Sequence, residues 1–227
     1  MREATDNQGG GLRALGNAYL RRRYAVLFYT LLLTMVAVPV LSALELQGIL
    51  IESLLAANLL AAVMPVQWGI RRPLLFVVMI VVWLARPLAV WLDQPAFSAV
   101  TLGIWTVIGL LAAAAALRFA MSATEIDAEH LYAALGAYLL AGIFFASSYW
   151  ILEQIAPGTF VGAGNFSRMS AIYFSFVTLA TLGYGDIVPR SDIARGLAII
   201  EGIGGQLFLA VLVARLISLY VGRRGAS

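Results

Sequence analysis

A short run near the C-terminal end of the chain has the residue types and spacing needed to bind a dehydrated cation. It reads Thr181-Leu182-Gly183-Tyr184-Gly185 and is followed by Asp186. A cation in a narrow pore must exchange its water shell for other oxygen atoms, which backbone carbonyls can supply. Gly183 and Gly185 allow backbone conformations that residues with a Cβ resist, so successive carbonyls can point at one axis. The Thr181 hydroxyl adds an oxygen, and we expect Leu182 and Tyr184 to face away from the ions and pack against the preceding segment.

The segments around this run indicate how it is held. Irregular backbone is tolerated at membrane depth only where protein buries it or where it lines a water-filled cavity. An aromatic stretch, 170–180, precedes the run and is too short to span a bilayer, so we expect a re-entrant pore helix there. With an apolar helix on either side, the arrangement resembles the tetrameric P-loop potassium channel superfamily. The filter of that family usually reads Thr-Val-Gly-Tyr-Gly-Asp, and Leu182 replaces the valine here.

The resemblance implies K+ as the permeant ion and no cofactor. One filter loop cannot enclose an axis, so four identical chains must contribute, which makes each chain the partner of three others in a homotetramer. It also implies which residues support the filter. Some relatives have, four residues before the threonine, a glutamate that bonds the filter aspartate; Val177 stands there instead. Tyr173 matches a position that often holds an aromatic donor. Its hydroxyl could bond Asp186, and aromatic packing alone is the alternative.

The apolar segment after the filter contains several small residues that could serve a gate. Counted from the filter aspartate, Gly205 falls where the family has its gating-hinge glycine, and Gln206 is expected to face the cavity below the filter. Ala210 and Ala214 form a small-residue face that could line the cavity or let helices cross closely. Helix packing alone is an equally good explanation of these residues. Glu201 could attract cations or hydrogen-bond to a neighbour, and the sequence leaves both roles open.

Composition places the whole chain in a membrane. Hydrophobic residues make up 62% of the 227 residues and charged residues only 12%, against roughly 25% charged in soluble domains. A bilayer is crossed by about 20 apolar residues. We therefore predict an all-α, polytopic membrane protein with six transmembrane helices plus the re-entrant pore helix and the filter. The six predicted spans are 24–44, 46–66, 73–92, 96–117, 131–152 and 193–221.

The predicted domains follow from these spans. They are a cytoplasmic N-terminal segment at 1–23, a four-helix domain at 24–121, a linker at 122–130, a pore domain at 131–221 and a short cytoplasmic tail at 222–227. Orientation follows from the arginines, because short cytoplasmic loops are enriched in positive charge. Arginines at 21–23, 71–72, 118 and 223–224 fall on one side, and Arg168, Arg190 and Arg195 near the pore are the exceptions. We expect both termini in the cytoplasm, the filter opening outward, and a bacterial inner membrane as the location.

The first four spans resemble a voltage-sensing domain in number but not in charge. A sensor needs about 3–4 charges per subunit that move through the field. The fourth span, 96–117, has none, and Arg118 lies at its cytoplasmic end. We therefore expect a domain that does not sense voltage. Glu52 and Arg86 lie at a similar depth in the second and third spans, where a pair would offset the cost of burying each charge. The sequence leaves two roles open for Glu52 and Arg86: a structural salt bridge, or a residual sensing or ligand site.

Other classes of function fit the sequence less well. No nucleophile–base set, metal-ligand spacing or phosphate loop is present, so we expect no enzyme. The arginines map to membrane boundaries, which argues against nucleic-acid binding. His130 could sense pH or pack at the membrane interface. The alternatives to a potassium channel are a non-selective cation channel, which commonly lacks the filter tyrosine retained at Tyr184, and a potassium transporter or regulatory pore-loop subunit.

Overall fold

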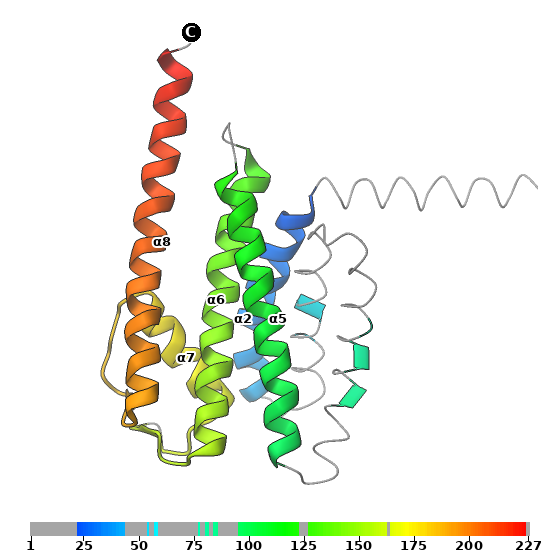
Figure 1. Ribbon diagram of the computed structural model, residues 1–227, viewed down its shortest axis with the longest axis vertical. Helices are drawn as coiled ribbons and strands as arrows, with labels where there is room; N and C mark the ends of the chain where they lie inside the picture. Colours follow the sequence, from blue (N-terminus) through cyan, green and yellow to red (C-terminus); the bar gives the residue numbers. More distant parts are fainter. Residues whose placement is uncertain are drawn as a thin grey trace, which may run out of the picture.

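The architecture is a set of long helices with one short helix between two of them (Figure 1). The computed structural model describes residues 22–43, 54, 57–58, 77, 80–81, 84–85, 95–122, 127–162 and 164–225. In chain order the elements are α2 (Arg23–Ala43), α5 (Pro95–Met121), α6 (Ala128–Ile155), β1 (Phe160–Val161), α7 (Arg168–Leu179), β2 (Val188–Pro189) and α8 (Asp192–Gly225).

Four of the described helices, α2, α5, α6 and α8, are long and apolar enough to cross a membrane. They coincide within a few residues with the first, fourth, fifth and sixth predicted spans, because the length of an apolar run determines where such a helix begins and ends. The second and third predicted spans lie almost entirely outside the described residues. The count of six spans therefore stays a prediction.

The helices α2, α5 and α6 pack around a core of small side chains. Alanines dominate the contact between α5 and α6, where a short side chain lets two helix backbones approach closely. The helix α2 adds larger residues to the same core, and Leu27 lies 3.5 Å from the position that a Cβ on Gly136 of α6 would take. The buried alanines of this seam are Ala112, Ala113, Ala116 and Ala120 from α5 and Ala133, Ala134 and Ala137 from α6.

A second core holds α7 between α6 and α8, as Figure 1 shows. Its members are mostly aromatic. The ring of Tyr149 on α6 meets that of Phe174 on α7 edge-on, with centroids 5.0 Å apart. Phe160 of β1 stacks on Phe166 at 4.4 Å. At Gly142 of α6 an added Cβ would overlap the ring of Phe176, so the glycine permits the close approach of α7.

The long helix α8 is the least covered of the four. Only 11% of its most apolar window is buried, against 33% for α2 and 39% for α5 and α6. Large apolar side chains stand exposed along its length. They are Ile193, Ile199, Ile200, Ile203, Leu207, Leu209, Val211, Val213, Ile217 and Val221. Most of the surface of α8 is therefore left for contacts outside the single chain.

Three details differ from the sequence-based expectation. The helix α6 begins at Ala128, inside the linker expected at 122–130, and α8 runs on to Gly225, into the expected tail at 222–227. Arginine is a good helix former, so the basic end of α8 gives the helix no reason to stop earlier. The strands β1 and β2 form a two-residue antiparallel ladder that the all-α expectation did not include.

Candidate functional site

The short helix α7 is fixed at its start by a reciprocal cap. The Ser167 hydroxyl accepts a hydrogen bond from the Ser170 amide at 3.1 Å, and the Ser170 hydroxyl accepts one from the Ser167 amide at 3.2 Å. These bonds satisfy amides that have no partner within the helix. The helix ends at Leu179, close to Thr181. The pore helix expected at 170–180 is thus present, two residues longer at its start.

The end of α7 holds the start of the candidate filter, residues 181–185, which we call the filter run. The carbonyl of Val177 accepts the amides of Leu182 at 2.8 Å and of Gly183 at 3.4 Å. The Thr181 amide donates to the carbonyl of Thr178 at 2.9 Å. The last carbonyls of a helix carry the negative end of its dipole, so this junction favours a positive charge nearby. Val177 therefore holds Leu182 and Gly183 through its backbone carbonyl, while its side chain is buried in the core.

The backbone of the filter run alternates in handedness. Thr181, Gly183 and Gly185 have φ of 57°, 54° and 77°, whereas Leu182 and Tyr184 between them have negative φ. In a regular extended chain successive carbonyls point to opposite sides, so inverting every second residue turns them to one side. A β-branched residue with positive φ is a conformational outlier, and Thr181 is the one non-glycine residue with positive φ in the described part. Such local strain clusters at functional sites.

The outer end of the run is tied to α7 by side chains. The Tyr173 hydroxyl donates to the Asp186 carboxylate at 2.7 Å, which is one of the two roles that the family resemblance left open for Tyr173. This bond raises the pKa of Tyr173 to about 12, so its hydroxyl keeps its proton at neutral pH. The ring of Tyr184 stacks on that of Tyr173, with centroids 6.4 Å apart. Leu182 remains 57% exposed, so the packing against α7 expected of both residues is seen within one chain only for Tyr184.

A loop between α6 and α7 supports the outer end from the other side. In the strand pair, Phe160 faces Pro189, and the Arg190 amide donates to the carbonyl of Thr159 at 2.7 Å. Gly162 has φ of 102°, and a Cβ there would overlap the carbonyl oxygen of Asp186. Only glycine therefore allows the loop to approach the filter this closely.

The inner helix α8 contacts the filter from below. The Gln206 side-chain amide donates to the Thr181 hydroxyl oxygen at 2.8 Å; that Gln206 faces a cavity below the filter stays a prediction. Gly205 is buried, and a Cβ there would overlap the carbonyl oxygen of Leu179. This contact gives a packing reason for the glycine; a hinge at Gly205 stays a prediction. Ala210 and Ala214 lie further along α8 and are exposed in the single chain, so a role in the cavity is still a prediction.

Glu201 is a residue whose role the sequence left open. Its side chain is fully buried. The Tyr149 hydroxyl donates to one carboxyl oxygen at 2.6 Å, and the hydroxyl of Ser175 lies 2.5 Å from the other. The carboxyl group therefore joins α6, α7 and α8. A hydrogen-bonding role is what the structure shows. The signal in the sequence was an acidic residue within the apolar stretch that follows the first turn of α8.

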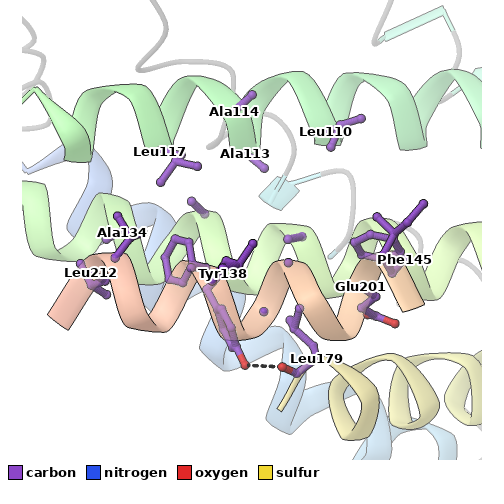
Figure 2. A pocket seen from close by; sticks show the side chains of 18 of the residues that line it. Leu110, Ala113, Ala114, Leu117, Ala134, Tyr138, Phe145, Leu179, Glu201 and Leu212 are labelled. Carbon is purple, nitrogen blue, oxygen red and sulfur yellow. Dashed lines mark hydrogen bonds between the residues drawn. The ribbon is translucent and has the colours of Figure 1, made fainter. Parts of the chain in front are cut away.

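An elongated cavity of about 480 Å³ lies between α5, α6 and α8 (Figure 2). Leu212 lies toward one end of it and Glu201 toward the other. Its lining is almost wholly apolar, which does not suit an ion. At its wall the Tyr138 hydroxyl donates to the carbonyl of Leu179 at 3.3 Å, so α6 also holds the end of α7.

The remaining candidates lie away from the filter. Glu52 and Arg86 are outside the described residues, so their pairing stays a prediction. The helix α5 contains one charged residue, Arg118, in its last turn. The ring of His130 stacks on that of Phe119 with centroids 4.3 Å apart, in agreement with a packing role. Among the described residues, no group of three His, Cys, Asp or Glu could hold a metal ion.

The part of the chain that contains these residues is similar to known proteins. A family model described as "Ion channel" matches residues 133–221, which include α7, the filter run and most of α6 and α8. The inward rectifier potassium channel Kirbac3.1 of Paramagnetospirillum magnetotacticum is 35% identical over 80 residues, 34% of this chain and 24% of the relative. Protein LctB of Bacillus caldotenax is 31% identical over 98 residues, 40% of this chain and 72% of LctB.

Another relative is similar over a comparable length of the chain. A voltage-gated potassium channel of Aeropyrum pernix is 27% identical over 94 residues, 41% of this chain and 30% of the relative. The chain spans less than a third of the length of the curated potassium channels it matches. No solved structure is significantly similar to it. The family model and these similar proteins together show that the chain belongs to the P-loop potassium channel superfamily.

Proposed function

We propose that the protein is a potassium-selective channel that conducts K+ passively across a membrane. The observation that carries this proposal is the alternation of φ along residues 181–185, since it turns successive carbonyls to one side. Several relatives are named potassium channels, and the Gly-Tyr-Gly of the filter run is retained. The proposal includes no cofactor, no enzymatic reaction and no nucleic acid.

The residues of the site have separate tasks in conduction. The carbonyls of the filter run replace the water that K+ loses. The Thr181 hydroxyl oxygen, oriented by Gln206, provides the lowest oxygen of the run. The C-terminal end of α7 favours a cation beside it. The Tyr173–Asp186 bond and the loop at Gly162 hold the outer end, so that the oxygen spacing is set by protein packing rather than by the ion.

The proposed assembly is a homotetramer. One filter run cannot enclose an axis, and four chains in cyclic symmetry would. Uncovered surfaces support this assembly: Leu182 and Tyr184 are 57% and 65% exposed in one chain, and most of α8 is uncovered. We place the channel in a bacterial inner membrane. We place both termini in the cytoplasm, because most arginines that flank the predicted spans, at 21–23, 71–72, 118 and 223–224, lie on one side.

The channel is proposed to be insensitive to voltage. One relative is named a voltage-gated channel, but the helix α5 carries only Arg118, in its last turn. A charge that crosses the whole membrane field gains ~2.3 kcal/mol per 100 mV. A single charge at the membrane boundary crosses little of the field, so it couples weakly to voltage. Single-channel recording in planar bilayers tests this part. A steep conductance–voltage curve with several gating charges would contradict it.

Potassium flux in reconstituted liposomes tests conduction itself. We expect K+ uptake that Ba²⁺ blocks and that Na+ does not replace. Gly183→Ala should abolish it, because a side chain is strained at φ of 54°. Gly196→Ala, in α8 with nothing within 4 Å of the new Cβ, is the matched control and should conduct. Equal K+ and Na+ flux would favour a non-selective cation channel, and no flux in either ion would favour a transporter or regulatory subunit.

A further inference from the structure

One acidic side chain lies behind the filter at the meeting point of three helices. Glu201 of α8 contacts Tyr149 of α6 and Ser175 of α7, and all three side chains are fully buried. The carboxyl group lies near one end of the apolar cavity (Figure 2). Both of these partners are uncharged hydroxyls. An ionised carboxylate buried without a charged partner is costly, so the surroundings favour the neutral acid.

The single hydroxyl hydrogen of Ser175 also indicates that Glu201 is neutral. Its hydroxyl oxygen lies 2.7 Å from the carbonyl oxygen of Gly142 and 2.5 Å from Glu201 Oε1. A serine hydroxyl has one hydrogen, and a carbonyl can only accept. If Glu201 were ionised, one of these two short contacts would have no hydrogen between its oxygens. Both are hydrogen bonds when Ser175 donates to Gly142 and a protonated Glu201 donates to Ser175.

This group is connected to the filter through a few backbone contacts. Ser175 lies two residues before Val177, whose carbonyl accepts the amides of Leu182 and Gly183. One helical turn beyond Glu201, Gly205 of α8 meets the carbonyl of Leu179 at the end of α7. The same face of α8 therefore follows α7 down to the first residues of the filter run. A shift at Ser175 would move the carbonyl that holds that run.

We propose that Glu201 is a positioning residue of the filter and that it acts as a neutral carboxylic acid, accepting from Tyr149 and donating to Ser175. The effect on ion selection rests on the proposed function. The protonation state does not, since it follows from the geometry of the three side chains. The two parts can therefore be tested separately.

Infrared difference spectroscopy tests the protonation state. The spectrum of the wild-type protein in lipid at neutral pH, minus that of Glu201→Gln, should contain the carbonyl stretch of a protonated carboxylic acid. Tyr149→Phe should shift this band, because it removes one hydrogen bond to the acid. Carboxylate bands in place of the acid band would overturn the proposal whether or not the protein conducts.

Flux in liposomes tests the positioning role. Glu201→Gln is neutral, can donate to Ser175 and accept from Tyr149, and should keep the K+/Na+ flux ratio of the wild type. Ser175→Ala should lower that ratio by up to about tenfold, the equilibrium factor of one buried hydrogen bond when its loss acts wholly on ion selection. Ser148→Ala is the matched control, since Ser148 bonds only the carbonyl of Phe144 in its own helix.

Three outcomes separate the possibilities. A Glu201→Gln variant with a collapsed flux ratio would show that the charge is needed and would overturn the proposal. A Ser175→Ala variant with the wild-type ratio would overturn the positioning role. A wild-type protein without K+ flux would contradict the proposed function instead, while the infrared band still decides the state of Glu201.

Discussion

Gly205 and Gly204 are adjacent glycines in α8 that should respond oppositely to the same substitution. Alanine is about 1 kcal/mol more favourable than glycine within a helix. At Gly204 nothing lies within 4 Å of an added Cβ, so Gly204→Ala should stabilise the protein by up to that amount. At Gly205 the new methyl would overlap the carbonyl oxygen of Leu179. Overpacking of this kind costs about 1–3 kcal/mol, so Gly205→Ala should be the less stable variant by about that difference.

The carbonyl of Leu179 cannot move aside freely. It accepts the Tyr138 hydroxyl at 3.3 Å and stands two residues before Thr181. Relief of the overlap would therefore stretch that bond or displace the start of the filter, and we expect Gly205→Ala to conduct less K+ than Gly204→Ala. Thermal unfolding in detergent and flux in liposomes measure the two effects. If both variants unfold at the same temperature and conduct equally, the packing argument is wrong and Gly205 is left with a hinge role alone.

Three further changes probe the ends of the filter. Tyr173→Phe removes the bond to Asp186, and single-channel K+ conductance should fall. Gly162→Ala should reduce K+ flux and thermal stability, because the added Cβ would overlap the carbonyl oxygen of Asp186. Gln206→Leu removes the donor to the Thr181 hydroxyl and should lower the K+/Na+ permeability ratio measured from reversal potentials. The free energy of unfolding should fall by only about 1 kcal/mol.

Matched variants make these results specific. Tyr29→Phe removes a hydroxyl that bonds Tyr132 away from the filter and should leave conductance unchanged. Gly158→Ala places alanine at φ of 85° with nothing within 4 Å of its Cβ. It thus shares the backbone strain of Gly162→Ala without the overlap. If Gly158→Ala and Gly162→Ala lose the same K+ flux and thermal stability, backbone strain rather than the overlap causes the loss. If Gln206→Leu keeps the wild-type permeability ratio, the Gln206 amide is not needed to orient the Thr181 hydroxyl.

The backbone conformation of residues 183 and 185 was predictable because its determinants are local. Gly183 and Gly185 indicate positive φ directly, whereas the bond from Tyr173 to Asp186 was one of two roles that the family resemblance left open for Tyr173. The left-handed conformation of Thr181 was not predictable, because a β-branched residue by itself disfavours it. The bonds of Thr181 to the Thr178 carbonyl of α7 and to the Gln206 amide of α8 explain how that conformation is held.

Long-range contacts account for most of what the sequence missed. The partners of Glu201 lie 26 and 52 residues before it, and no local pattern joins them. The ladder of β1 and β2 escaped prediction since each strand has two residues, too few for an alternating pattern. Helix bounds were predicted well where an apolar run is long, and less well at the ends of α6 and α8, where polar residues continue the helix.

The uncovered surface of α8 affects how the stability of this protein must be measured. A surface that folding leaves open is covered either by lipid, which is always in excess, or by other subunits, whose concentration the experimenter sets. Stability that depends on subunit contacts changes with protein concentration by mass action. If the proposed tetramer covers α8, the unfolding temperature should rise with the protein-to-lipid ratio. Variants in α8 should be compared only at one fixed ratio, because otherwise a change in assembly would be mistaken for a change in folding.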